Sequence, residues 1–266
     1  MSPSDLFHSG RLKEAIDAQT QKVRANPTDN PARFFLCELF LFAGELDRVR
    51  KQLDVLRYDD PQHSAAVAQY RQALDSEAAR REVFAGKGEP KGLTNAPDHV
   101  KLRFDALPYL ARGEHAEARK RLDEANAAVP ALNGLLNGKP LEGIFDADER
   151  FGTVLEVFAT GGAYTWVPLE RVTEITMNPP KNPRDVILRP AHVVLTDGIE
   201  GDVLLPGLYP LSHEHADDEV KLGRGTVWLG NDGEVTRGAG GRILLVGGAM
   251  VPFGTVNQLL ITTPAN

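Results

Sequence analysis

The chain has 266 residues, of which 42% are hydrophobic and 25% charged, a composition typical of a globular protein with a sizeable core. Its net charge is −7 and its first half is balanced: residues 1–133 carry 20 basic and 20 acidic side chains, whereas residues 134–266 carry 10 and 17. An acidic chain without a basic stripe is a poor candidate for binding nucleic acid or an anionic membrane. No apolar run reaches the roughly 18 residues that span a bilayer.

The N-terminus lacks the charged start and apolar stretch of a signal peptide, so we expect a cytoplasmic protein. The single cysteine, Cys37, agrees with a reducing compartment and leaves no intrachain disulfide. Cys37 lies in an apolar run, which predicts a buried structural thiol and not a catalytic nucleophile.

A 34-residue repeat is visible in the first half of the chain, because Gly10 and Gly44 are 34 residues apart and so are Pro27 and Pro61. Three glycine–proline pairs share an offset of 17 residues: Gly10 and Pro27, Gly44 and Pro61, Gly113 and Pro130. The glycine permits a tight turn between two antiparallel helices, and the proline ends the second helix. Stacked hairpins of this kind resemble the tetratricopeptide repeat in degenerate form. Residues 62–84 predict a further helix, and residues 85–97 a loop.

The segment 34–42 reads FFLCELFLF and is apolar almost all round, although a surface helix needs only one apolar stripe. One interpretation is a central helix covered on both sides by neighbouring repeats. The other is a helix whose second face lines a concave groove that binds a partner helix. On the second interpretation the candidate partner-binding residues are Phe35, Leu39 and Phe42.

After residue 129 the pattern changes to short runs rich in Val, Ile, Leu and Thr, punctuated by Gly and Pro. Expected strands are residues 153–160, 163–167, 172–177, 186–188, 192–195, 202–205, 226–229, 242–246 and 256–262. The fold class predicted is therefore α+β, with a strongly bent sheet or partial barrel following the helical repeats. The expected division is a helical-repeat domain over 1–132, a linker over 133–150 and a β-rich domain over 151–266.

Chemical motifs in the second half favour no enzyme. His213 and His215 lie in the stretch SHEHADDE, but no spacing supplies a third metal ligand, and a solvated loop is the expectation. His192 is expected to be a hydrogen-bonded histidine at the start of a strand and not a general base. The glycines of residues 238–241 predict a hairpin turn, because the lysine of a phosphate-binding loop is missing. No metal, nucleotide or other cofactor is expected.

Three aromatic residues of the second half, Tyr164, Trp166 and Trp228, are expected to pack in the β-rich core and hydrogen-bond through their polar ends. The alternative is an aromatic hot spot on an exposed sheet.

Three stretches carry a resemblance to the ImpE (TagJ) family: LEVFATGGAYTWVPLERV at 155–172, NPPKNPRDVILRPAHVVLTDGIEGDVLLPGLYP at 178–210, and VKLGRGTVW at 220–228. The most specific parts are Trp166-Val167-Pro168, Arg184-Asp185 and Arg189-Pro190. With the short opening helix pair and the Phe-rich second unit, the resemblance covers essentially the whole chain.

This resemblance implies a non-enzymatic adaptor of bacterial type VI secretion, a contractile injection machine. Its implied partners are the N-terminal helix of the small sheath subunit and, through it, the ClpV-type ATPase that recycles contracted sheath. Two alternatives stay open: a general peptide-binding scaffold, and a hydrolase or metal enzyme that uses the histidines and carboxylates of the β-rich half.

Overall fold

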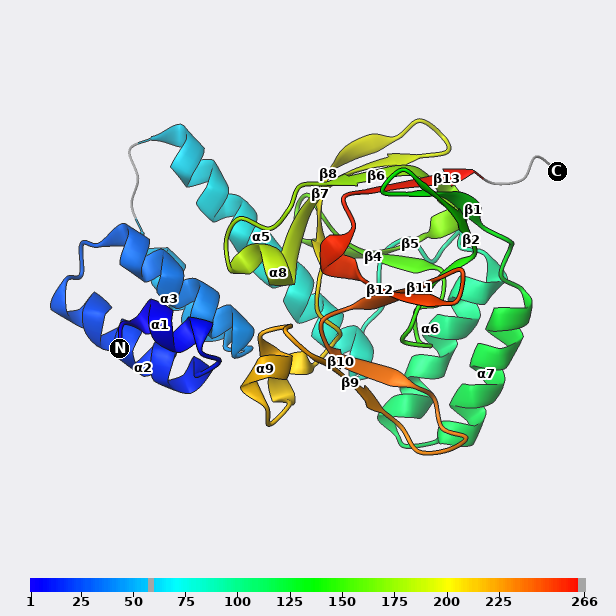
Figure 1. The fold of residues 1–266 in the computed structure, drawn as a ribbon, viewed down its shortest axis with the longest axis horizontal. Helices are drawn as coiled ribbons and strands as arrows, with labels where there is room; N and C mark the ends of the chain where they lie inside the picture. Colours follow the sequence, from blue (N-terminus) through cyan, green and yellow to red (C-terminus); the bar gives the residue numbers. More distant parts are fainter. Residues whose placement is uncertain (57–59, 263–266) are drawn as a thin grey trace.

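The computed structural model describes residues 1–56 and 60–262, and places helices before strands along the chain (Figure 1). The helices of the first half are α1 (Pro3–His8), α2 (Leu12–Ala25), α3 (Asn30–Phe42), α4 (Leu46–Val55), α5 (Pro61–Phe84), α6 (Asp98–Ala111) and α7 (His115–Ala127). Shorter helices lie among the strands: η1 (Leu169–Arg171), α8 (Arg184–Ile187), η2 (Ser212–Glu214), α9 (Asp218–Lys221) and η3 (Phe253–Thr255). The α+β prediction is confirmed.

The repeated glycines have the role that the spacing predicts. Gly10, Gly44 and Gly113 join α1 to α2, α3 to α4 and α6 to α7, with φ of +76°, +73° and +75°. Only glycine adopts this left-handed backbone without strain. The small or branched residues five positions later are fully buried against the preceding helix of each hairpin: Ala15, Val49 and Ala118. The helical hairpins are therefore specified locally.

An open sheet follows, with strand order β2-β1-β13-β6-β7-β8-β4-β5 and every neighbouring pair antiparallel. Its strands are β1 (Asn133–Leu136), β2 (Lys139–Glu142), β4 (Val154–Ala159), β5 (Ala163–Pro168), β6 (Val172–Met177), β7 (Leu188–Leu195), β8 (Glu200–Pro206) and β13 (Gln258–Thr262). Two small sheets accompany it, from β9 (Thr226–Leu229) with β10 (Arg237–Gly240), and from β3 (Ile144–Asp146), β11 (Ile243–Val246) and β12 (Ala249–Pro252).

Helix α5 lies between the first helices and the sheet, as the long diagonal helix of Figure 1. It contacts α4 on one side and β4 and β5 on the other. At its C-terminal end the ring of Phe84 lies 5.6 Å from that of Phe151 and 6.5 Å from that of Trp166. The helical repeats and the sheet thus share one apolar core.

Three parts of the second half differ from expectation. Residues 133–150 were expected to be a linker, but they form β1, β2 and β3; β1 pairs with β13, which lies more than 100 residues away in the chain and gives no local signal. The expected strand at 186–188 is mostly the helical turn α8. Its start is fixed by Asp185, whose carboxylate accepts backbone hydrogen bonds from Lys181 and Asn182 at 2.9 Å. The glycine run expected as a turn forms β10.

The remaining expected strands each overlap an observed one, and the turns at 197–198, 231–233 and 247–248 join β7 to β8, β9 to β10 and β11 to β12. Whether residues 1–132 and 151–266 separate as domains stays a prediction.

The two glycine turns at Gly113 and Gly44 make a matched test. A Cβ at Gly113 would meet no atom within 4 Å, so Gly113→Ala should lower the free energy of unfolding by about 1 kcal/mol through backbone strain alone. A Cβ at Gly44 would lie 2.1 Å from Cδ2 of His213, so Gly44→Ala should cost roughly 2 kcal/mol or more. Urea unfolding measures both; equal losses would contradict the close contact between the α3–α4 turn and η2.

Candidate partner-binding site

The side chains predicted to receive a partner helix lie on α3, but the chain itself covers them. Leu39 is 0% exposed and Phe42 2% exposed, and Phe35 is half-buried. The ring of Phe7 in α1 packs on Phe35 at 5.9 Å and on Phe42 at 5.6 Å between ring centroids. Leu39 and Phe42 therefore belong to the core, as the interpretation of a helix covered on both sides expects, and partner binding by Phe35, Leu39 and Phe42 stays a prediction.

A segment of the strand-rich half, around α9, holds α1 in this position. Arg224, in the turn between α9 and β9, donates hydrogen bonds to the backbone oxygens of Phe7 at 2.8 Å and His8 at 3.1 Å. Its guanidinium also lies 5.3 Å from the centre of the Phe7 ring. Asp218 of α9 accepts from the backbone N–H of Leu12 at 3.0 Å. The first helical hairpin is thus fastened to the strand-rich half.

The other side of α3 meets α8 and η2. Glu38 is buried near Arg184 and Asp185; burial raises the pKa of Glu38 to about 7, and the charge of Arg184 only partly opposes this. His213 lies against the α3–α4 turn, where burial, with the charges of Arg81 and Arg80, lowers its pKa to about 4. The histidine predicted in a solvated loop is therefore a neutral packing residue at pH 7.

An accessible groove remains on α2, α3 and α4. It encloses about 560 Å³, and its floor consists of the buried side chains of Val23, Leu36 and Phe40. Four basic side chains also line it: Arg24, Arg33, Arg48 and Lys51. The Arg48 guanidinium stacks 3.9 Å above the Phe40 ring. An apolar floor with cationic walls suits the acidic, amphipathic face of a helix.

Sequence reasoning did not single out these basic residues, although Arg48 and Lys51 are three positions apart and share one face of α4. Arg33 is already engaged, because it donates to Gln52 at 2.5 Å and to the Pro27 carbonyl at 2.8 Å. Arg24 and Lys51 are exposed on the groove walls.

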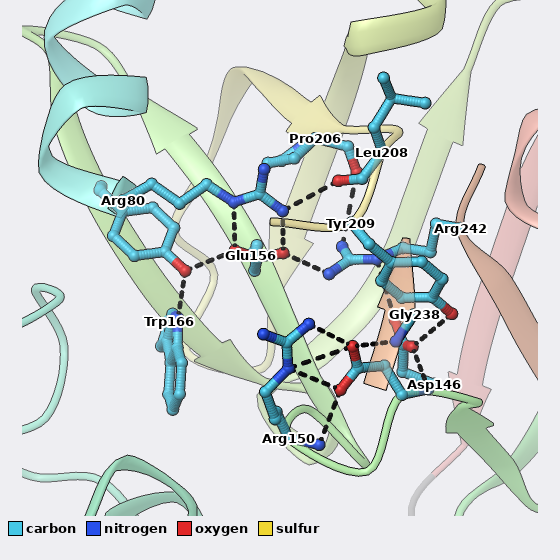
Figure 2. A network of polar contacts seen from close by, with 12 residues as sticks. Arg80, Asp146, Arg150, Glu156, Trp166, Pro206, Leu208, Tyr209, Gly238 and Arg242 are labelled. Carbon is cyan, nitrogen blue, oxygen red and sulfur yellow. Dashed lines mark hydrogen bonds and ion pairs between the residues drawn. The ribbon is translucent and has the colours of Figure 1, made fainter. Parts of the chain in front are cut away.

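A buried polar network joins α5 to the sheet (Figure 2). Arg80 of α5 donates to both carboxylate oxygens of Glu156 in β4, at 2.7 and 2.8 Å, and to the Leu208 carbonyl at 2.9 Å. Arg242 approaches Glu156 from the other side and pairs through Nε with Asp146 at 2.9 Å. The Tyr164 hydroxyl donates to Glu156 and accepts from Trp166 at 2.6 Å.

The charges of this network explain why Glu156 can be buried. Burial alone would raise the pKa of Glu156, but the guanidinium groups of Arg80 and Arg242 outweigh it and lower the pKa to about 2. The sequence signal for such a site is a single carboxylate inside an apolar strand, VLEVFA. The arrangement is that of a structural tie and not of an acid–base pair.

The other candidate chemical residues lie apart from one another. His192 of β7 pairs across the strands with Asp202 at 2.9 Å, and His215 accepts from the backbone N–H of Asp217 at 3.1 Å. Within residues 1–56 and 60–262, no cluster of three or more His, Cys, Asp or Glu side chains is placed to hold a metal ion. No helix in those same residues is long and apolar enough to cross a membrane.

The aromatic expectation holds for two residues and not for the third. Tyr164 and Trp166 are buried in the network, but Trp228 on β9 is partly exposed, as the alternative of an exposed aromatic foresaw.

Comparison with known proteins gives the family. The tetratricopeptide repeat family matches residues 6–74. A crystal structure of protein VPA1032 from Vibrio parahaemolyticus has a TM-score of 0.89 at 22% identity, with 98% of this chain and 97% of that chain covered. A tetratricopeptide-like helical layer on an open antiparallel sheet is thus the class of fold.

The particular family follows from the second half and from a curated relative. The ImpE protein family matches residues 138–260. The "Type VI secretion system accessory component TagJ" of Pseudomonas aeruginosa is 36% identical over 230 residues, which cover 86% of this chain and 81% of the relative. The chain belongs to the ImpE (TagJ) family.

The Glu156 network makes a testable contribution to stability. Glu156→Gln removes the charge between two buried arginines and should lower the free energy of unfolding at pH 7 by roughly 3 kcal/mol. Because the pKa of Glu156 is lowered on folding, its stabilisation is present above about pH 4.5 and is lost as the pH falls toward 2. The free energy of unfolding, measured with urea from pH 7 to pH 3, should therefore fall less steeply for the variant than for the parent protein. The exposed Glu117→Gln serves as the control; a matching loss there would contradict the assignment.

Proposed function

We propose that this protein is an adaptor of bacterial type VI secretion that works in the cytoplasm by binding, without catalysing a reaction. The observation that carries the proposal is the curated TagJ relative, an accessory component that aligns with 86% of this chain. The tetratricopeptide-like half supports it, because stacked helical hairpins are a common scaffold for binding peptides and helices.

The partner we propose is the N-terminal helix of the small sheath subunit, seated in the groove of α2, α3 and α4. The face of Phe35, Leu39 and Phe42 is closed by α1, so a partner would reach it only if α1 and the Arg224 contact were displaced. The groove, in contrast, is accessible and presents Arg24 and Lys51 at its walls. The bound helix should therefore be amphipathic and acidic on the side that faces the groove.

Binding of this kind would act through local concentration. A helix that buries a few apolar side chains and meets two or three cations binds with about micromolar affinity once ordering costs are included. An adaptor held on contracted sheath would raise the effective concentration of sheath material near a ClpV-type ATPase. No chemical step by the adaptor is needed.

The groove is tested by charge reversal. Arg24→Glu with Lys51→Glu should weaken binding of a synthetic sheath-subunit N-terminal helix by about tenfold or more in calorimetry, and more strongly at low salt. Both side chains are exposed, so the melting temperature should change little. The control, Lys22→Glu with Lys120→Glu, makes the same charge change at exposed positions outside the groove.

Three outcomes separate the possibilities. If the groove variant binds as tightly as the parent protein, the binding site lies elsewhere on the molecule. Equal weakening in the control would reduce the effect to net charge. No affinity of the parent protein for any sheath-subunit helix would defeat the partner assignment and favour a general peptide-binding scaffold.

A further inference from the structure

A second hollow lies on the strand-rich half, away from the groove. It encloses about 450 Å³ and is lined by residues of α8, of the turn after α9, of β9, of β12 and of η3. This volume is in the range of sites for small ligands or for one or two peptide side chains. Its lining includes Arg189, Gly225, Trp228, Met250 and Phe253.

Arg189 is the unusual member of this lining. It is 2% exposed, yet within the described chain its side chain donates only to the carbonyls of Gly254 at 3.3 Å and Val256 at 3.4 Å. These distances exceed the usual range for N–H···O bonds. Its Nε has no hydrogen-bond partner among residues 1–56 and 60–262. A buried guanidinium with such weak partners is costly unless an anion meets it.

The other buried arginines of the strand-rich half are paired differently. Arg242 contacts the carboxylates of Glu156 and Asp146, and Arg150 donates through Nε to Asp148 at 2.9 Å. Burial would lower the pKa of Arg242, but its two carboxylates reverse the shift. At Arg189 burial prevails and the pKa is lowered, and the charge of Asp185 only partly opposes this shift. Arg189 forms no ion pair with a carboxylate among the described residues, although Asp185 also lines the cavity.

The rim of the cavity offers apolar surface. Trp228 is 37% exposed and Met250 67% exposed, which is unusual for large hydrophobic side chains, and Pro252 and Phe253 lie beside them. Trp228 is held in place by Tyr209, whose ring centroid is 5.8 Å from its own. A fixed, half-exposed tryptophan beside a flexible methionine is a typical contact for an apolar side chain.

We propose that this cavity binds a peptide carboxylate carried next to an apolar residue, with Arg189 as its cationic floor and Trp228 and Met250 as its apolar rim. The carboxylate completes the partners of Arg189 through charge-assisted hydrogen bonds. The apolar neighbour covers the indole ring. This site is separate from the α2–α4 groove, and it stands whether or not the sheath helix binds there.

The proposal is tested with short peptides that differ by one group. The probes are N-acetyl-Phe-Glu-amide, which offers a side-chain carboxylate, and N-acetyl-Phe, which offers a terminal one; N-acetyl-Phe-Gln-amide and N-acetyl-Phe-amide are their neutral counterparts. Two-dimensional NMR titration of the full chain follows the two tryptophan indole signals. Trp228 should shift, whereas the buried Trp166 serves as an internal reference. At least one acid should bind about tenfold tighter than its amide, and which acid does so identifies the source of the carboxylate.

A filling variant tests the location without touching Arg189. Gly225 lines the cavity, its φ lies outside the left-handed region, and a Cβ there would meet no atom within 4 Å. Gly225→Leu should therefore fold normally and abolish binding of the acid probe. Gly201→Leu, at an equally open glycine on β8, should bind like the parent protein.

Arg189→Gln should remove the preference for acid over amide in a protein whose melting temperature shows that it is folded. If that variant does not fold, Gly225→Leu still decides. Equal affinity of the parent protein for acid and amide overturns the proposal. So does a Gly225→Leu variant that binds as the parent does, or a Gly201→Leu variant that loses binding equally.

Discussion

Glu156 carries a carboxylate into a part of the sheet that solvent does not reach, and two arginines from distant parts of the chain meet it there. Arg80 comes from α5, Glu156 from β4 and Arg242 from the residue before β11, so the three charges tie a helix, a strand of the large sheet and a late segment together. Removal of one partner would leave a buried charge unpaired, which is far more costly than the pair is stabilising. These contacts help to hold α5 on the sheet.

The position of α5 determines what the helical repeats can expose. Because α5 packs on β4 and β5, the helices before it lie beside α8, η2 and α9. The inner face of α3 is then filled by the chain's own side chains, and α1 is fastened over Phe35 and Phe42 by Arg224. A repeat scaffold that would otherwise present a concave face has used it for internal packing. The groove of α2, α3 and α4, with its basic walls, lies outside that packing.

The sequence predicts the features that depend on neighbouring residues. A glycine with positive φ and a buried small residue five positions later are local requirements, so the hairpins at Gly10, Gly44 and Gly113 could be found from spacing alone. The strands at β1 and β10 could not. Their short, glycine-containing segments become strands only because β13 and β9 lie alongside, and pairing partners are set by the whole fold.

The cover over α3 could not be predicted for a related reason. A run such as FFLCELFLF indicates that a helix has more than one buried face, but not what buries the second one. Here the cover is Phe7 of α1 together with α8, and the residue that holds α1, Arg224, comes from more than 200 positions later in the chain. In the sequence, Glu156 and Arg189 likewise appear only as charged residues among apolar neighbours. Whether such a charge is paired within the fold is decided by tertiary contacts.

The two proposed surfaces share one feature, which is that each places basic side chains on a chain that is acidic overall. The chain has a net charge of −7, so an acidic ligand is repelled at a distance, and this repulsion is screened beyond about 8 Å at physiological salt. Basic side chains line the walls of the α2–α4 groove, and Arg189 lies at the cavity beside Trp228. Each also requires an apolar group to fill the adjacent hollow. Binding at the two proposed surfaces would discriminate between acidic ligands by fit, because charge alone does not hold a ligand that lacks the apolar contact.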